Sequence, residues 1–574
     1  MEHGDRRVPQ IQGGSSPCSL CSQANRIFAQ EKYQPYRITS KTPPPIKCDT
    51  LVPAPIAFNF KTYSESLGRT QPVDQEGAEV FFFLFPNLLP LHFFFSSHFL
   101  LLLPPFPMEV PALMDPPLSL VTYREQQYKL KIEAKSMDDS VVVQVVESSF
   151  VAPSEPTPSK ALWLSPLDLM QANRSHTPTL YLYSPDDTAA DFFDVTRLKE
   201  SMAKALVHFY PLAGRLGIGD DGRTEITCNG EGALFVVARS DLTVDDIRDM
   251  KPSPELRSLV VPRIDPPSII LAIQVIFLKC GGVAIGTAMH HAAIDASSAL
   301  HFFQTWSAIS RNISNGRGGG AAAAVEIPCH DRTLLRARSP PTVHPDALSK
   351  FYPKVTLSEP SGPIASAVFS ISGDQVASLR RLCGGATAST FCAVGALVWQ
   401  CQCTCLARRL SPESEARVIF PVNIRRKMRP PLPDRYFGNA LIRVCAAGAV
   451  GDVASEALAS VAGRIRGAIS QTDDALVHSA IDYFEMAQAE VLGSRPLKGA
   501  MPETDLHIIS WLGTPMHDAD FGWGKPQVMT RAESVRGGFV YLMNDGADSG
   551  GVRVLMSLEA QNLKEMERLL YAKL

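Results

Sequence analysis

The stretch SIILAIQVIFLKCGGVAIGTAMHH, from Ser268 to His291, contains two β-rich apolar runs separated by Gly281 and Gly282. Two such runs with a glycine pair between them predict a β-hairpin. The second run ends at a pair of histidines, so the hairpin places His291 at the end of a strand.

Strand-like and helix-like stretches alternate on both sides of this hairpin, and the sequence therefore predicts a mixed α/β fold. The segment VTRLKESMAKALVHFYPLAGRL has apolar residues at helical spacing until Pro211 and Gly214. A second helix is expected in ASSALHFFQTWSAISR, and the chain closes with the strand VRVLMSL and the amphipathic helix AQNLKEMERLLYAKL. The alternation of Cys401, Cys403 and Cys405 is typical of a strand or turn.

The first part of the chain has a different amino-acid composition. Up to about residue 79 it is rich in Pro, Ser and Gln, which predicts disorder. The apolar run 80–106 is long enough to cross a membrane, but four prolines interrupt it, so we expect no membrane anchor and keep a tether formed by this run as the alternative. We expect residues 1–136 to be a disordered or non-native extension outside the functional fold.

The remaining chain divides into two halves. We expect an N-terminal domain over 137–311, a crossover linker over 312–360 and a C-terminal domain over 361–574. The linker begins with the flexible stretch GRGGGAAAA.

Composition excludes several classes of partner. A formal net charge of -3 offers no general attraction for nucleic acid or anionic lipid. The 12 cysteines are scattered, with a lone CxxC at Cys18 and Cys21, which favours a reducing, cytoplasmic location and no zinc site.

His291 and Asp295 form an HxxxD pair in HHAAID. A chain of this composition supplies about one such spacing by chance, so the setting of the pair decides its meaning. An imidazole at the end of a strand can project into a cleft and accept a proton near neutral pH. A metal-binding pair and a hydrogen-bonded core histidine are the alternatives.

Several further segments occur together with HHAAID. They are LSPLD (Leu164–Asp168), FYPLAGRL (Phe209–Leu216), NGEGALF (Asn229–Phe235), YFGN (Tyr436–Asn439) and DFGWG (Asp520–Gly524). In their order and separation these segments resemble the BAHD acyl-CoA-dependent acyltransferases, over essentially all of residues 137–574. One departure is Ala296, where relatives often carry Gly.

The resemblance implies two chloramphenicol-acetyltransferase-like domains with the active-site channel at their interface. It implies that acyl-CoA is a co-substrate, that no cofactor or metal is permanently bound, and that the protein is a monomer. His291 is the implied general base, and Trp511 is a candidate donor to the oxyanion.

The resemblance assigns structural roles to other residues of the motifs. Asp295 is expected to turn away from the channel and pair with an arginine. Asp520, with Gly522 and Gly524, is expected to lie away from His291, and Arg425 is its candidate partner.

The expected acceptor depends on the segment around Trp511. Relatives that use shikimate or quinate carry a threonine at the position of Ile509 and an arginine that Arg495 matches only with a shift of one residue. The segment PETDLHIISW instead places Glu503 and Asp505 two residues apart, which predicts contact with an ammonium group.

This segment also resembles grass enzymes that join hydroxycinnamoyl groups to agmatine, putrescine, tyramine or tryptamine. We therefore expect transfer of a hydroxycinnamoyl or benzoyl group to an amine. Lys427 and Arg429 are candidates for the CoA phosphates. Three alternatives stay open: a solvated loop at PETD, an O-acyltransferase for shikimate or quinate, and a catalytically silent binding relative.

Overall fold

The computed structural model describes residues 143–186, 191–314, 325–345, 357, 359–360, 362–488, 499–546 and 549–574. All of them belong to one compact unit of the chain. The predictions for residues 1–136, for the glycine-rich part of the linker and for Arg495 lie outside the described residues.

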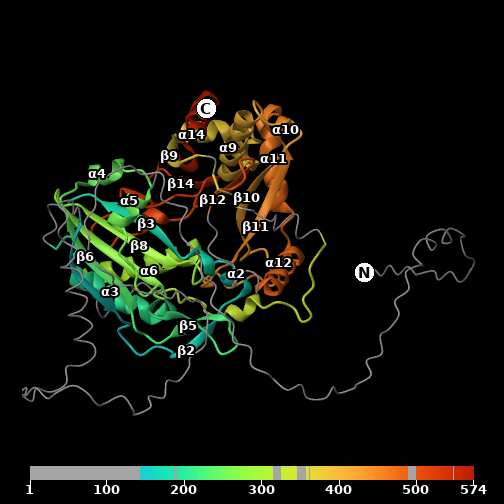
Figure 1. The fold of residues 1–574 in the computed structure, drawn as a ribbon. Helices are drawn as coiled ribbons and strands as arrows, with labels where there is room; N and C mark the ends of the chain where they lie inside the picture. Colours follow the sequence, from blue (N-terminus) through green and yellow to red (C-terminus); the bar gives the residue numbers. More distant parts are fainter. Residues whose placement is uncertain are drawn as a thin grey trace, which may run out of the picture. The chain divides into compact units, whose positions relative to one another are not determined.

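The predicted hairpin lies at the centre of the first sheet (Figure 1). This sheet has the strand order β1 (Val143–Val151), β6 (Ala233–Ser240), β7 (Leu271–Leu278), β8 (Val283–His290), β3 (His176–Tyr183) and β13 (Val528–Arg531). β7 and β8 are antiparallel, and Gly281 between them has a φ of 83°, which a glycine adopts without strain. The hairpin prediction is confirmed.

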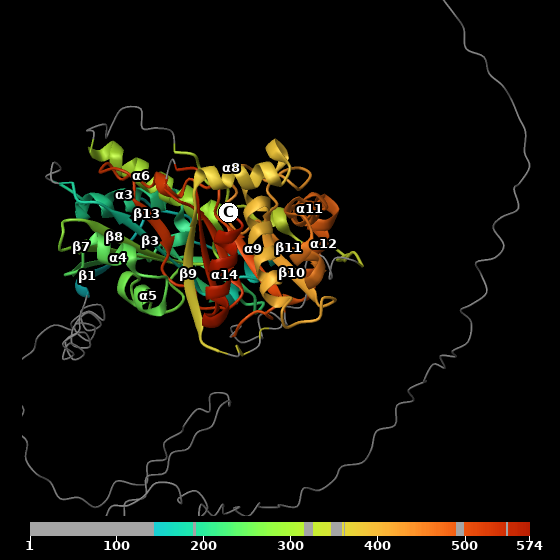
Figure 2. The same cartoon turned by 90° about the horizontal axis from the view of Figure 1, so that it is seen from above.

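Helices cover both faces of the first sheet, as Figure 2 shows from above. Odd-numbered residues of β3 and β8, such as Tyr181 and Ile285, pack with α3 (Val195–His208) and α6 (Ala296–Ser314). Even-numbered residues such as Leu180 and Ala284 pack with α4 (Val244–Asp249) and α5 (Pro254–Val260). This separation follows from the two-residue period of a strand.

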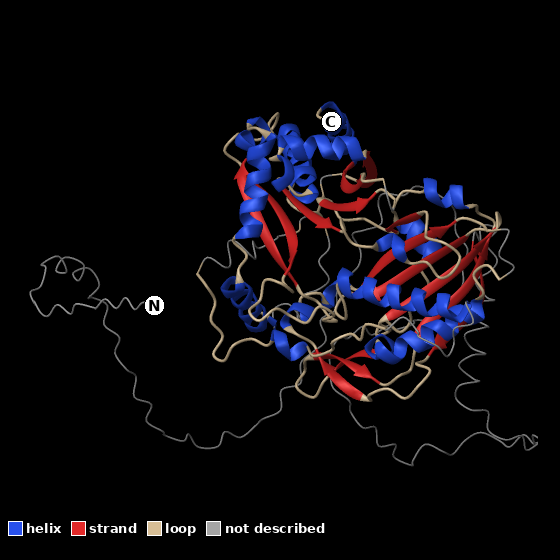
Figure 3. Ribbon diagram, turned by 180° about the vertical axis from the view of Figure 1, so that it is seen from behind, coloured by secondary structure: helices blue, strands red, loops and turns tan. Residues whose placement is uncertain are grey.

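The second sheet is built from the C-terminal half alone. Its order is β11 (Leu441–Ala449), β10 (Glu415–Asn423), β12 (Asp505–Ser510), β14 (Phe539–Asn544), β15 (Val552–Glu559) and β9 (Ile364–Ile371). The helices of this half are α8 (Gly373–Leu382), α9 (Thr390–Leu406), α10 (Val450–Ser455), α11 (Leu458–Ser470), α12 (Asp474–Met486) and α14 (Ala560–Ala572). Figure 3 shows most of these helices gathered on one side of the sheet, whereas α12, which contacts α2, lies apart from them.

Helix α9 is the core of this second half, because nearly all its residues are buried and it contacts α8, α10, α11 and α14. Cys401, Cys403 and Cys405 lie in this helix, so the strand or turn predicted for them is wrong. A helix buried on all sides has no polar face, and its sequence therefore lacks a helical period.

Shorter elements complete the described chain. A small sheet has the order β2 (Lys160–Trp163), β5 (Thr224–Cys228) and β4 (Arg215–Ile218). The remaining helical turns are α2 (Pro166–Leu169), η1 (Ala172–Arg174), η2 (Tyr210–Ala213), η3 (Arg332–Leu335), η4 (Gly385–Thr387) and η5 (Met516–Asp518).

The two halves share a strand. β13 comes from the C-terminal half, yet it pairs antiparallel with β3 at the edge of the first sheet. The first sheet is therefore completed by a segment about 350 residues away from β3 in sequence. None of the described helices is long and apolar enough to cross a membrane.

Candidate active site

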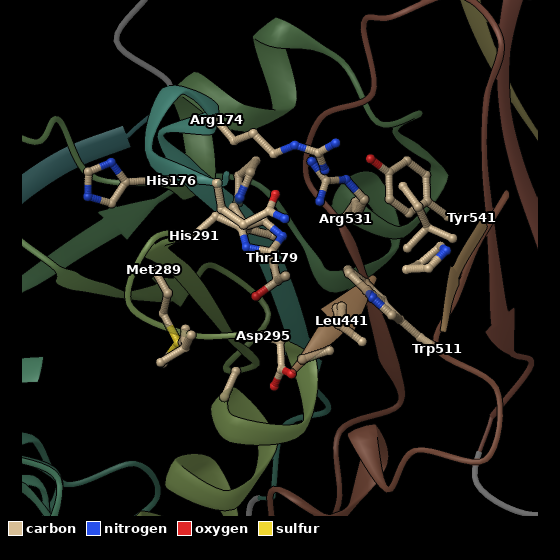
Figure 4. Close-up of a pocket in the computed structure, with 18 of the residues that line it drawn as sticks. Arg174, His176, Thr179, Met289, His291, Asp295, Leu441, Trp511, Arg531 and Tyr541 are labelled. Carbon is tan, nitrogen blue, oxygen red and sulfur yellow. The ribbon is translucent and has the colours of Figure 1, made fainter. Parts of the chain in front are cut away.

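A cavity of about 650 Å³ lies where the two sheets face one another. Its wall includes residues of β3, β8 and β13 from the first sheet, and of β10, β11, β12 and β14 from the second. Figure 4 shows His291, Asp295, Trp511 and Tyr541 around this cavity. Both halves of the chain therefore build the site.

The first sheet supplies one wall of the cavity through alternating residues. The odd-numbered side chains are Thr177, Thr179 and Tyr181 of β3, Thr287 and Met289 of β8, and Met529 and Arg531 of β13, and His176 and Pro178 of β3 also border the cavity. Thr179 lies opposite both Thr287 and Arg531 in the strand register, and the hydroxyl groups of Thr179 and Thr287 are 2.5 Å apart. His291 continues the same face just beyond the end of β8.

Only one histidine of the pair lines the cavity. His290 belongs to the other face, where its ring meets His176 edge-on at 4.9 Å and burial lowers its pKa to about 3. His291 is held by its backbone, whose N–H donates to the Ser175 carbonyl at 3.0 Å and whose carbonyl accepts from Asn439 Nδ2 at 2.9 Å. The strand period explains why neighbouring histidines have different surroundings.

The environment of His291 keeps its imidazole neutral. Burial, followed by the positive charge of Arg174, lowers its pKa to about 4, and Arg531 acts in the same direction. Asp295 opposes this shift. A neutral imidazole at physiological pH can accept a proton, as a general base must.

Asp295 belongs to the cavity wall, and its carboxylate is fully engaged by protein groups. Arg425 donates to both oxygens, at 2.7 and 3.0 Å, and the backbone N–H groups of Ser298 and Ala440 donate at 3.0 and 3.1 Å. Burial alone would raise the pKa of Asp295, but the charge and hydrogen bonds of Arg425 hold it below its usual value. The expectation of an arginine partner is confirmed, and that arginine is Arg425.

The YFGN segment is the part of the site whose role the sequence did not reveal. Arg425 also donates to the carbonyls of Tyr436 and Gly438, both at 3.2 Å. Asn439 donates from its backbone and side chain to Asp168, at 2.8 and 2.9 Å, in addition to its bond to His291. LSPLD and YFGN were visible as motifs, but their mutual contact exists only in the folded chain.

Trp511 lies in the cavity wall, directly after β12. It is buried, its backbone N–H donates to the Leu542 carbonyl, and its ring packs against Tyr541 at 5.9 Å. This placement is compatible with the predicted contact to the reacting carbonyl.

DFGWG lies outside the cavity wall, as expected, but its predicted ion pair is wrong. The Asp520 carboxylate accepts from the backbone N–H groups of Gly522 and Gly524, at 2.8 and 3.0 Å, and Arg425 is occupied by Asp295. Both glycines have positive φ, of 107° and 92°, which lets the loop close on its own aspartate. The loop packs on the first half, where Arg197 stacks over Trp523.

The predicted amine site at Glu503 and Asp505 is contradicted by the structure. Asp505 is buried against Arg417, whose Nε donates to it at 3.1 Å, and exposed Glu503 pairs with Arg409. β12 begins only at Asp505, and both acids line a small separate hollow instead of the cavity of His291. The spacing of Glu503 and Asp505 in the sequence could not predict that each acid pairs with an arginine.

Lys427 and Arg429 also lie outside the cavity wall. The Lys427 ammonium donates to the Ile469 carbonyl at 3.1 Å, and the Arg429 backbone N–H donates to Asp474 at 2.7 Å. Contact with CoA phosphates stays a prediction for both. Within the described residues, no group of three or more His, Cys, Asp or Glu is placed to hold a metal ion.

The comparisons with known proteins define the class. A family model described as the Transferase family matches residues 141–572. The chain belongs to this family, the BAHD acyltransferases, and it is an acyltransferase with the two-domain fold of that family.

Two relatives and two solved structures show the range of similarity. The chain is 44% identical to putrescine hydroxycinnamoyltransferase 1 of Oryza sativa subsp. japonica, over 76% of this chain and 100% of that protein. It is 36% identical to shikimate O-hydroxycinnamoyltransferase of Nicotiana tabacum, over 75% and 99%. The fold is similar to vinorine synthase (TM-score 0.58, 23% identity, 75% and 98% covered) and to F. graminearum TRI101 complexed with coenzyme A and deoxynivalenol (0.61, 19%, 71% and 96%).

Replacing Asp295→Asn tests the structural role of the carboxylate. The variant leaves the buried Arg425 charge without its partner, so we expect a loss of about 3–5 kcal/mol in unfolding free energy, measured by urea denaturation. The exposed Glu567→Gln, which also removes one negative charge, should change stability by less than about 0.5 kcal/mol. Equal stability of the two variants would contradict this role.

Proposed function

We propose that this protein transfers a hydroxycinnamoyl group from CoA to an amine, with His291 as the general base. The observation that carries the proposal is a neutral imidazole on the wall of a cavity built by both halves of the chain. Members of the family use acyl-CoA as co-substrate. Monomeric state and cytoplasmic location are part of the same proposal.

The reaction needs one proton acceptor and one group that stabilises developing charge. The acceptor nitrogen attacks the thioester carbonyl while His291 takes a proton from that nitrogen. The carbon–sulfur bond then breaks, the amide is released, and the imidazolium returns its proton to the CoA thiolate. We propose that the Trp511 indole N–H donates to the carbonyl oxygen as it becomes negative.

The positive charges near His291 oppose protonation of the imidazole and of an incoming amine alike. Arg174 and Arg531 disfavour an imidazolium ion, and they disfavour an ammonium ion at the same place. An amine that enters the cavity is therefore held in its uncharged, nucleophilic form.

Two observations support an amine in place of an alcohol. The 44% identical rice relative is named for putrescine, whereas the tobacco enzyme named for shikimate is 36% identical. Ile509 lines the cavity, and its hydrocarbon side chain cannot hydrogen-bond a hydroxyl of a shikimate-like acceptor. The carboxylates of Glu503 and Asp505 give no support to an amine acceptor, because they lie outside the cavity.

Replacing His291→Ala removes the proposed base. We expect kcat to fall by about 10²- to 10⁴-fold, measured as release of free thiol from coumaroyl-CoA, with little change in unfolding free energy. His290→Ala, on the opposite face of the strand, is the matched control. The folded fraction of this variant should retain most of the activity of the parent enzyme. Turnover of His291→Ala within a few-fold of the parent would refute the base assignment.

An acceptor panel tests the amine assignment. With coumaroyl-CoA as donor, we expect amide products from at least one of tyramine, tryptamine, putrescine and agmatine, identified by mass spectrometry. Shikimate and quinate should give at least about tenfold lower kcat/KM, since Ile509 offers their hydroxyl groups no hydrogen bond. Exclusive turnover of shikimate or quinate would show an O-acyltransferase, and no turnover would favour a binding protein.

A further inference from the structure

Asp168 lies at the centre of a second buried polar network, beside the HHAAID turn (His290–Asp295). Its Oδ1 accepts from the backbone and the side chain of Asn439, at 2.8 and 2.9 Å, and its Oδ2 lies 2.8 Å from Nη1 of Arg332. The side chains of Asp168 and Arg332 are 0% and 1% exposed. A carboxylate buried in this way holds its partners in one geometry, because either partner would otherwise leave a buried charge unpaired.

Each partner of Asp168 also donates to a carbonyl of the HHAAID turn. Nδ2 of Asn439 donates to the His291 carbonyl at 2.9 Å, and Nη2 of Arg332 donates to the Ala293 carbonyl at 2.6 Å. These two carbonyls lie two residues apart in the turn. One carboxylate therefore aligns two donors that fix the backbone around His291.

The imidazole of His291 depends on that backbone for its position. Its Nδ1 is buried, and within the described part of the chain no side chain hydrogen-bonds it. A general base acts only within hydrogen-bond reach of the proton that it removes. Because no side chain orients the ring, a shift of the turn would move the base away from the acceptor.

Arg332 belongs to the crossover between the two halves, and this crossover is fixed on the YFGN loop. The backbone N–H of Cys329 donates to the Arg435 carbonyl, and the N–H of Phe437 donates to the Cys329 carbonyl, both at 2.8 Å. The guanidinium of Arg332 lies against Gly438, where an added Cβ would be 3.3 Å from its Cζ. The crossover thus carries Arg332 to the backbone of the active-site turn.

We propose that Arg332 is a positioning residue for His291, acting with Asp168 through the backbone of the HHAAID turn. The assignment rests on the proposed role of His291 as general base, and it deepens that role. Arg332 and Asp168 both lie outside the cavity wall. Replacing Arg332 should therefore slow the chemical step and leave the binding of both substrates nearly unchanged.

Arg332→Lys keeps a positive charge beside Asp168 but removes the planar fork that reaches two acceptors at once. With coumaroyl-CoA and the acceptor of the panel that has the highest kcat/KM, we expect kcat per mole of folded enzyme to fall by about 10- to 100-fold. KM for donor and acceptor should stay within about twofold of the parent values, because the lost contact acts on the chemical step.

Arg215→Lys is the matched control. Arg215 is also buried, pairs with Glu231 at 3.1 Å and donates to the carbonyls of Gly214 and Gly232, both at 2.8 Å, but it contacts neither the HHAAID turn nor the cavity wall. Its folded fraction should keep kcat within about twofold of the parent. A kcat loss equal to that of Arg332→Lys would show a general effect of buried arginines and overturn the proposal.

The same substitution in a His291→Ala background separates positioning from general stability. If Arg332 acts through His291, Arg332→Lys should lower the residual kcat of His291→Ala by less than about twofold, since no base is left to position. An equal loss in both backgrounds, or a parent-like kcat in Arg332→Lys alone, overturns the proposal. The proposed function fails in a different way, namely if His291→Ala itself retains turnover or the parent shows none.

A second variant covers the case in which Arg332→Lys does not fold. The double variant Asp168→Asn/Arg332→Gln removes both buried charges together, which costs less stability than leaving one of them unpaired. We expect the same pattern from it, a loss of kcat in the parent background and almost none in His291→Ala. A parent-like kcat in this double variant would likewise overturn the role of Arg332.

Discussion

The buried ion pair between Asp295 and Arg425 fixes the position of the proposed base. Burying two charges costs several kcal/mol unless hydrogen bonds satisfy both groups, and here they do. The carboxylate also accepts from Ser298 and Ala440, while the guanidinium also binds the Tyr436 and Gly438 carbonyls. One network thus joins the turn after β8 in the first half to β10 and the YFGN loop in the second. His291 occupies that turn.

The second point of contact between the halves is β13 with the DFGWG loop before it. The loop closes on Asp520 and docks on α3 and α6, where Arg197 and Ser310 donate to the Phe521 carbonyl. The chain then enters the first sheet as β13, which brings Arg531 onto the face that carries His291. The C-terminal half therefore contributes directly to the wall that the first sheet presents to substrate.

Local patterns predicted the hairpin, the helices after it and the strand-end position of His291. Such elements can be predicted because the spacing of apolar residues along a short segment follows the period of a strand or a helix. Contacts between residues far apart in the sequence were harder to predict. The family resemblance implied an arginine partner for Asp295, but Arg425 was assigned to Asp520, since no residue next to either acid in the sequence indicates which of them the arginine meets. Asp505 is neutralised by Arg417 on the neighbouring strand, and Arg531 joins the cavity wall only because β13 pairs with β3.

The central claim is that the acceptor nucleophile reaches His291 inside the cavity shared by the two halves. A crystal structure with CoA and an unreactive acceptor analogue measures this directly. The account predicts the nucleophilic atom within about 2.6–3.2 Å of the exposed ring nitrogen of His291, with the CoA sulfur in the same cavity. A nucleophile beyond hydrogen-bond reach of His291, with another base closer to it, would contradict the account.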